Sequence, residues 1–202
     1  LVYLDVVASL YGRNSLHDLL NKTSQNVFIP ITAGGGIRSV MDASSLLASG
    51  ADKIAINSAA LLRPELIKEL SYAFGKQCVV ASIQARKTGS STWEAMADAG
   101  REKSGKDVIA WAKEVEYLGA GEILITSVDK DGTCSGPDSS LIEEVSKHIG
   151  IPIIAAGGFS QSSDVGMHLN NKNISDVCIG SALHSGITNI NVLKKNIGLE
   201  FP

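Results

Sequence analysis

The sequence of 202 residues predicts an α/β protein of the (βα)8 TIM-barrel class that lacks its first βα unit. Three observations predict this fold. Short apolar runs alternate with longer amphipathic stretches, a pair of motifs recurs in the two halves of the chain, and the sequence opens on a strand-like run without an initiator Met. The length suits one domain with one core, so we expect residues 1–202 to form a single barrel domain with an internal half-barrel repeat.

Seven apolar runs rich in Ala or β-branched residues have the composition of parallel strands that are buried on both faces. These runs are residues 1–7, 28–33, 53–57, 78–84, 122–128, 152–156 and 176–179. Helical periodicity separates them, most clearly over residues 39–49, 64–74, 107–118 and 139–148. Strict alternation predicts a parallel sheet, for which a doubly wound arrangement is the alternative to a barrel. Residues 87–106 are polar and are expected to form a loop over the barrel mouth.

The internal repeat favours the barrel. Residues 29–37 read IPITAGGGI and residues 151–159 read IPIIAAGGF, while residues 56–59 read INSA and residues 179–182 read IGSA. The two copies lie four strands apart along the chain. In an eight-stranded ring, that separation places them on opposite sides of one mouth, at the carboxyl ends of the strands.

Each copy of the repeat has the features of a phosphate site. A Gly-Gly turn at the end of a strand lets the backbone approach a ligand, and the Asn-Ser or Gly-Ser turn after the next strand adds a hydroxyl and backbone N–H donors. The alternative is that the glycines only permit tight turns, but two copies at matching spacing favour binding. Two opposed phosphate sites imply an elongated substrate with a phosphate at each end.

Carboxylates follow two of the predicted strands, where barrel enzymes carry their chemistry. Asp5 ends the first run, and Asp129, Asp131 and Gly132 belong to the segment SVDKDGT after residue 126. Asp129 and Asp131 are candidates for acid–base catalysis. The alternative is an Asx-type turn that satisfies its own backbone, because Asp-Gly is common in turns.

Composition argues against several classes of function. A net charge of −3 carries no basic excess, so we expect neither nucleic acid nor an anionic membrane as a partner. No apolar run approaches the roughly 20 residues of a membrane span. The cysteines are far apart and are expected to be free thiols of a cytoplasmic protein: Cys78, Cys134 and Cys178. The histidines are scattered and are expected at ordinary surface positions, without a metal or another cofactor: His17, His148, His168 and His184.

These motifs together resemble the cyclase subunit of imidazole glycerol phosphate synthase, an enzyme of histidine biosynthesis. The matching segments are residues 4–9, 33–38, 50–60, 119–133 and 154–158. The resemblance implies a lyase that takes a bis-phosphorylated intermediate and ammonia, closes the imidazole ring and releases an aminoimidazole nucleotide. It also implies a separate glutaminase subunit that docks on the amino-terminal face of the barrel and sends ammonia through the interior.

The resemblance assigns the candidate residues to roles. One phosphate would bind at Gly36, Asn57 and Ser58. The other would bind at Asp131, Gly132, Gly158, Gly180 and Ser181. Lys53 and Glu122 begin strands at the amino-terminal face, where the residues alone predict a stabilising ion pair. The resemblance instead places them at the charged entrance of the ammonia passage.

The sequence departs from the family at the catalytic pair, an Asp that ends the first strand and an Asp that ends the fifth. The first strand has no counterpart here, and the fifth-strand position is Gln84. A glutamine can hydrogen-bond a substrate but cannot exchange a proton near neutral pH. Three hypotheses therefore stand: a cyclase in which Asp129, Asp131 or another group covers for Gln84, a cyclase-like ammonia-conducting partner of a sugar amidotransferase, or the related sugar-phosphate isomerase.

Overall fold

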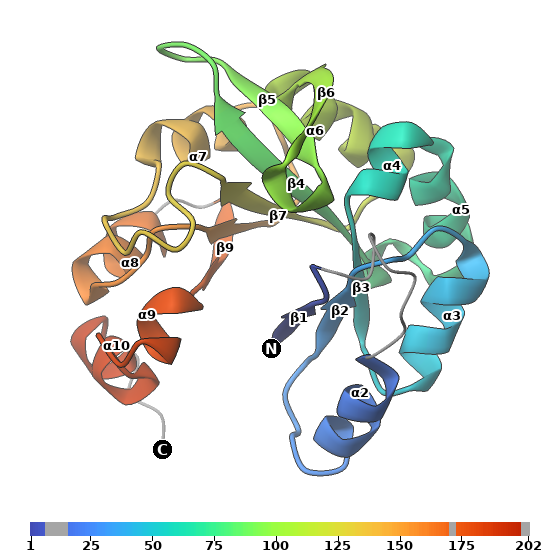
Figure 1. Cartoon of the computed structure of the whole chain (residues 1–202), viewed down its shortest axis with the longest axis horizontal. Coiled ribbons are helices and arrows are strands. Elements are labelled where there is room, and N and C mark those ends of the chain that lie inside the picture. The colour runs from blue at the N-terminus through green and yellow to red at the C-terminus, as the bar shows by residue number, and fades with distance from the viewer. Residues whose placement is uncertain (7–15, 170–172, 199–202) are drawn as a thin grey trace.

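The computed structural model describes residues 1–6, 16–169 and 173–198. Its central element is a curled parallel sheet with helices on the outside (Figure 1). The parallel strands, in spatial order, are β1 (Val2–Leu4), β2 (Thr32–Gly34), β3 (Lys53–Ile56), β4 (Val79–Lys87), β7 (Glu122–Ser127), β8 (Ile153–Ala156) and β9 (Ile174–Cys178). Within the described residues β1 and β9 do not pair, and the sheet is an open arc. The α/β barrel-class architecture is confirmed.

The helices follow the strands in the expected alternation. They are α2 (Leu16–Ser24), α3 (Val40–Ala48), α4 (Ser58–Leu62), α5 (Glu65–Phe74), α6 (Val108–Leu118), α7 (Ser139–Ser146), α8 (Ser162–Leu169), α9 (Ser181–His184) and α10 (Ile190–Asn196). Helix α6 begins and ends where the sequence predicts: Asp107 accepts a hydrogen bond from the Ala110 N–H, and Gly119 takes a left-handed conformation at the end. Across the described ranges, none of these helices has the length and apolarity to span a bilayer.

Alternation of side chains along the strands divides the core into two layers. The outer layer lies between the sheet and the helices and includes Ile83 and Ile123. The inner layer lies inside the arc, where Ala55, Val80 and Leu124 form a small apolar cluster. Because parallel strands of this kind are covered on both faces, their sequences read as continuous apolar runs.

The prediction of a polar loop over residues 87–106 is wrong. Strand β4 continues to Lys87, and β5 (Trp93–Ala97) and β6 (Glu102–Asp107) extend it as an antiparallel hairpin that rises from the sheet (Figure 1). A short 3-10 turn, η2 (Asp98–Gly100), joins the two hairpin strands, and a second, η1 (Lys76–Cys78), precedes β4. The polar composition concealed the hairpin because its outward side chains are exposed.

The hairpin is anchored to the helical layer by Trp93, which is 2% exposed. The indole Nε1–H donates to Asp138 Oδ2 (3.1 Å), and Asp138 also accepts from the Leu141 N–H at the start of α7. Burial alone would raise the pKa of Asp138, but hydrogen bonds from Ser140, Leu141 and Trp93 outweigh it and hold the pKa below its usual value.

Candidate active site

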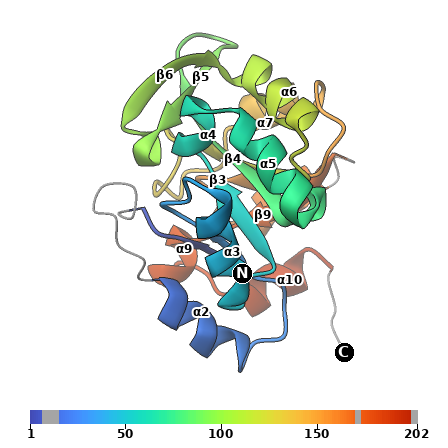
Figure 2. The ribbon, with the colours of Figure 1, turned by 90° about the vertical axis from the view of Figure 1, so that its right-hand side faces the viewer.

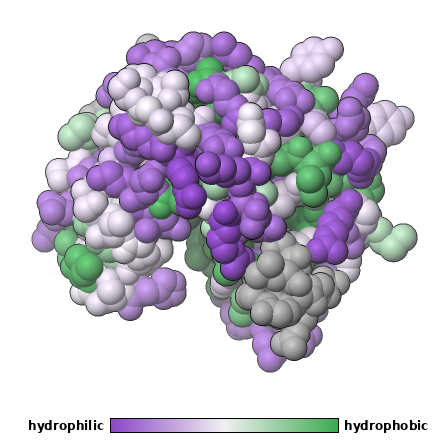
Figure 3. Space-filling view, turned by 45° about the horizontal axis from the view of Figure 1, so that its top comes forward, coloured by the Kyte–Doolittle hydropathy of each residue, from purple (hydrophilic) through white to green (hydrophobic). Residues whose placement is uncertain are grey.

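Two adjoining pockets open at the carboxyl ends of the parallel strands. The first has a volume of about 480 Å³ and the second about 180 Å³. Leu4, Val6 and Gln84 line both pockets, so the two meet around the side chain of Gln84. Figure 3 shows the molecule hollowed between the two arms of the open arc. This position is where ligands bind in barrel enzymes.

The eight residues predicted to bind phosphate divide between the two pockets. Those of the first half of the chain line the first pocket: Gly36, Asn57 and Ser58. Those of the second half line the second pocket: Asp131, Gly132, Gly158, Gly180 and Ser181. The half-barrel repeat therefore brings its two copies to neighbouring pockets in the manner that the sequence spacing predicts.

The first pocket is built on the turns after β2 and β3. Gly35 and Gly36 have φ values of +110° and +71°, a region that glycine adopts without strain. A Cβ on Gly35 would lie 2.3 Å from the Asp5 carbonyl oxygen, so the close passage of the two chains requires glycine. Helix α4, which Ser58 begins, has only five residues.

Sequence reasoning missed several residues of the first pocket. Arg38 and Arg63 add two guanidinium groups to its lining, and Ser82 and Asp98 add a hydroxyl and a carboxylate. Asp98 lies 40 residues from Ser58 in the chain but contacts it directly through the hairpin turn. Arg38 ends the segment 33–38 that carries the first glycine turn, whereas no local motif marks Asp98, which the fold rather than the sequence spacing brings to the site.

Gln84 is held by Asn57. Asn57 Nδ2 donates to Gln84 Oε1 (3.3 Å) and to the Met96 carbonyl oxygen (3.0 Å). With its oxygen facing Asn57, Gln84 can offer the two N–H donors of its amide to a ligand. Asn57 Oδ1 is buried without a hydrogen-bond partner among the described residues, as expected of an atom that completes its bonding with a ligand or water.

The second pocket is built from interlocked loops. The Gly136 N–H donates to the Gly158 carbonyl oxygen (3.0 Å), and the Asp131 N–H donates to the Ser127 carbonyl oxygen (2.9 Å). Gly158 has a φ of +87°, and a Cβ there would lie 2.2 Å from the Gly136 carbonyl oxygen. In the described part of the chain no Lys or Arg lines this pocket, and its side-chain donors are the hydroxyls of Thr126 and Ser181, the Gln84 amide and two thiols, beside backbone N–H groups.

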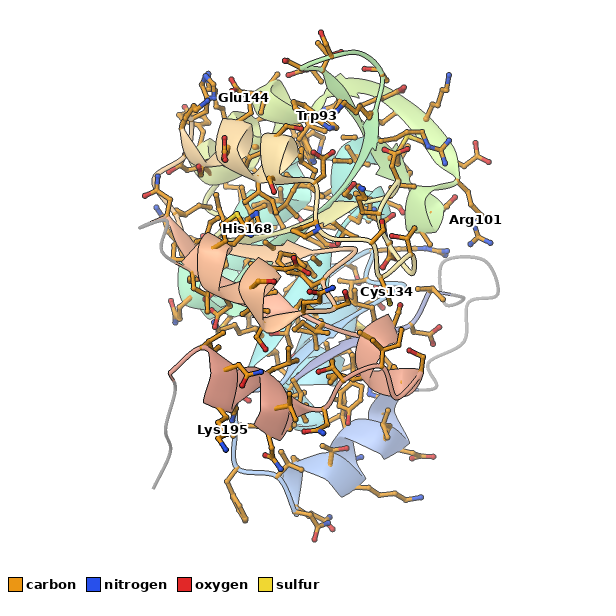
Figure 4. The ribbon with its side chains drawn as sticks, turned by 90° about the vertical axis from the view of Figure 1, so that its left-hand side faces the viewer. Trp93, Arg101, Cys134, Glu144, His168 and Lys195 are labelled. Atoms are coloured by element: carbon orange, nitrogen blue, oxygen red, sulfur yellow. The ribbon has the colours of Figure 1, made fainter. Side chains whose placement is uncertain are left out.

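Two cysteines also line the second pocket, Cys134 from the loop after β7 and Cys178 from the end of β9. Burial raises the pKa of the Cys178 thiol. Figure 4 shows Cys134 and Arg101 toward the same side of the molecule, while Lys195 of α10 lies toward the other.

Of the remaining catalytic candidates, two line a pocket and one does not. Asp5 lines the first pocket and Asp131 the second. Asp129 is absent from the described lining of both pockets, and its Oδ2 accepts a hydrogen bond from the Lys87 N–H (2.8 Å). This bond ties the loop after β7 to the hairpin, so the geometry gives Asp129 a structural role. Its participation in catalysis stays a prediction.

Lys53 and Glu122 lie at the opposite ends of their strands from the pockets. Lys53 Nζ donates to Glu122 Oε1, which forms the ion pair that the residues alone predict. Both side chains are partly exposed. They begin β3 and β7, the two neighbours of β4, so the pair lies at the amino-terminal end of these strands.

The histidines gather into no metal site: within the described ranges, no group of three His, Cys, Asp or Glu side chains is placed to hold an ion. The surface placement expected for His168 is wrong. This residue of α8 is 5% exposed, its Nδ1 contacts the Asp164 carbonyl oxygen, and its ring meets Phe159 edge-on at 5.5 Å (Figure 4).

Comparison with known proteins agrees with this arrangement. The family model described as "Histidine biosynthesis protein" matches residues 1–189. The imidazole glycerol phosphate synthase subunit HisF of Legionella pneumophila is 55% identical over 161 residues, which cover 80% of this chain and 76% of that protein. The subunit of the same name from Bacillus cereus strain Q1 is 43% identical over 197 residues, which cover 98% of this chain and 78% of the relative. The chain therefore belongs to the histidine biosynthesis family that includes subunit HisF of imidazole glycerol phosphate synthase.

Proposed function

We propose that the protein is the cyclase of this pathway: it uses ammonia to close the imidazole ring of a bis-phosphorylated intermediate, and it releases imidazole glycerol phosphate and an aminoimidazole nucleotide. The observation that carries the proposal is the pair of pockets that meet at Gln84, each with a glycine turn and a serine after a strand. A ligand with a phosphate at each end would span both pockets and place its middle beside Gln84.

The two ends of this ligand would be held by different means. In the first pocket the guanidinium groups of Arg38 and Arg63 supplement the Ser58 hydroxyl. In the second pocket the phosphate would depend on backbone N–H groups around Gly158 and on Ser181. Backbone donors fixed by a folded loop bind an anion without a loss of side-chain freedom.

Proton transfer would fall to the pocket carboxylates. Asp5 lines the first pocket and Asp131 the second, whereas Gln84 between them can only donate and accept hydrogen bonds. In this proposal Gln84 orients the reacting centre, and Asp131 or Asp5 exchanges the proton. Because general acid–base catalysis contributes about 10²- to 10⁴-fold, an amide at this position predicts slow turnover.

Ammonia would enter at the other end of the arc. Lys53 and Glu122 lie there as a partly exposed pair, and of the inner cluster of Ala55, Val80 and Leu124, Ala55 and Leu124 line the pockets. We propose that a glutaminase subunit docks on this face and delivers ammonia past the ion pair. The relatives carry the word "subunit" in their names, which is consistent with a partner.

The experiment supplies the purified protein with the bis-phosphorylated intermediate and an ammonium salt. The proposal predicts both products in equal amounts. The specific observation that favours a second function is Gln84, since a protein that only conducts ammonia needs no titratable group there. That function predicts stimulation of a partner glutaminase without either product.

A further inference from the structure

The turn between β5 and β6 lies against the first pocket. Asp98 and Ala99 line this pocket, and Figure 2 shows the hairpin alongside α4, the helix that Ser58 begins. The Asp98 N–H donates to Ser58 Oγ (2.9 Å), and Ser58 Oγ–H donates to Asp98 Oδ1 (3.3 Å). The hairpin therefore reaches from the edge of the sheet back to a residue proposed to bind phosphate.

The Ser58 hydroxyl has only one hydrogen to donate. In this structure that hydrogen is directed to the Asp98 carboxylate. A phosphate oxygen that is fully ionised can only accept hydrogen bonds, so a phosphate that binds the Ser58 hydroxyl requires the same hydrogen. The carboxylate and the phosphate are consequently alternatives at this hydroxyl, and their like charges oppose occupation of the pocket by both.

The turn that presents Asp98 is strained. Asp98, Ala99 and Gly100 have φ values of +45°, +56° and +82°, and the first two are not glycine. Residues with a Cβ rarely adopt this left-handed backbone region, and they persist there where neighbouring contacts hold them. The contacts are the Ser58 pair, a hydrogen bond from Arg86 to the Gly100 carbonyl oxygen (2.9 Å) and one from Arg101 to the Asp98 carbonyl oxygen (2.9 Å).

We propose that Asp98 sets the phosphate affinity of the first pocket by competing for the Ser58 hydroxyl. The inference rests on the proposed function only in taking the first pocket as a phosphate site. A phosphate binds at Ser58 when the Asp98 carboxylate withdraws, which releases one anchor of the strained turn. Among the contacts of the described residues no carboxylate accepts a hydrogen bond from Ser181, so this competition is confined to the first pocket.

The test is calorimetric titration of the protein with inorganic phosphate at low ionic strength. Asp98→Asn keeps the size of the side chain and removes its charge, and we expect about tenfold tighter binding. Glu102→Gln is the matched control: it removes a carboxylate from the same hairpin, at an exposed position outside the first pocket, and should leave the affinity unchanged. The gain from Asp98→Asn should shrink as salt screens the charges.

A double variant shows whether the gain arises at Ser58. Adding Ser58→Ala should abolish the tighter binding of Asp98→Asn, whereas phosphate bound in the second pocket would be unaffected. Equal affinities for Asp98→Asn and Glu102→Gln, or a gain that survives Ser58→Ala, would overturn the proposal, as would a failure of both the unaltered protein and Asp98→Asn to bind phosphate.

This titration is independent of turnover. If the cyclase assay fails while Asp98→Asn still tightens phosphate binding through Ser58, the proposed function is lost and the role of Asp98 stands. If products form while Asp98→Asn behaves as the control does, the role of Asp98 is lost and the proposed function stands.

Discussion

Asn57 donates a hydrogen bond to Gln84 at 3.3 Å. The bond joins a residue proposed to bind phosphate to the residue at the junction of the two pockets. An asparagine amide can donate equally well to a carboxylate. An aspartate at position 84 is one methylene shorter than the glutamine, but it would place a carboxylate at the same junction of the two pockets, which makes the position suitable for a direct test.

Gln84→Asp should raise the turnover number with the bis-phosphorylated intermediate and ammonium by several hundredfold, since general acid–base catalysis contributes about 10²- to 10⁴-fold. The matched control is Gln84→Asn, which has the same length as aspartate but cannot exchange a proton. The measurement is steady-state turnover of the two variants beside the unaltered protein. Equal rates for the two variants would show that no proton transfer is missing at this position.

Lys53→Met should impair the delivery of ammonia from the glutaminase partner to the pockets. We expect turnover driven by glutamine and a glutaminase partner to fall several-fold, while turnover driven by ammonium salt stays unchanged because the pockets lie at the other end of the strands. The loss of unfolding free energy should stay below about 1 kcal/mol, since the ion pair is partly exposed.

The control for this variant is Lys147→Met, which removes the cation of an exposed pair with Glu144 on the outer helical layer. In Lys147→Met, turnover with glutamine and the glutaminase partner and turnover with ammonium salt should both stay unchanged. If Lys53→Met slows the two reactions to the same degree, the ion pair has no special part in ammonia delivery.

Gly158→Ala should damage the second pocket. The added Cβ would lie 2.2 Å from the Gly136 carbonyl oxygen at a left-handed φ, so we expect a loss of about 1–3 kcal/mol of unfolding free energy and weaker substrate binding. Gly166→Ala in α8 meets only ordinary contact and should be neutral or slightly stabilising. Denaturant unfolding and substrate titration compare the two, and equal effects would contradict the close packing at Gly158.

Asp138→Ala should destabilise the protein by roughly 2–4 kcal/mol, because it removes the cap of α7 and leaves the buried indole N–H of Trp93 without its acceptor. Asp107→Ala, which removes only an exposed cap of α6, should cost about 1 kcal/mol. Urea unfolding of the two variants measures the difference.

The pH dependence of stability provides a second measure of Asp138. Its pKa is lowered in the folded state, so its stabilising contribution is complete above the unfolded pKa of about 3.9 and is lost as the pH falls toward the folded value. Asp138→Ala should lack this part of the acid destabilisation. An identical slope below pH 4 in the unaltered protein and the variant would contradict the lowered pKa.

The residues of the site that could be predicted from sequence are those of the internal repeat, which lie in both pockets. Matching glycine turns and serines identify parallel strand ends, and parallel strands bring their carboxyl ends to one edge, so Gly36, Ser58, Gly158 and Ser181 were recognisable without coordinates. The parallel sheet was predictable for a related reason: strands buried on both faces carry a strong apolar signal.

The other residues depend on contacts between distant segments of the chain, for which the local sequence carries no signal. The hairpin of β5 and β6 is polar on its outward face, and Trp93 is buried in the core, where Asp138, 45 residues later, accepts its N–H. Asp98 reaches Ser58 through the same hairpin, and Asp129 turns to the Lys87 N–H instead of a pocket. Each contact joins residues 40 or more positions apart, where sequence spacing carries no information.

The most direct test of the proposed function is the simultaneous assay of both products when the protein receives the bis-phosphorylated intermediate and ammonium. We predict slow formation of imidazole glycerol phosphate and the aminoimidazole nucleotide in a one-to-one ratio, dependent on ammonium and reduced about tenfold or more by Ser58→Ala or Ser181→Ala, each of which removes one hydroxyl donor from a pocket. Absence of both products above the ammonium-free background, in a protein that binds the intermediate, would contradict the cyclase function.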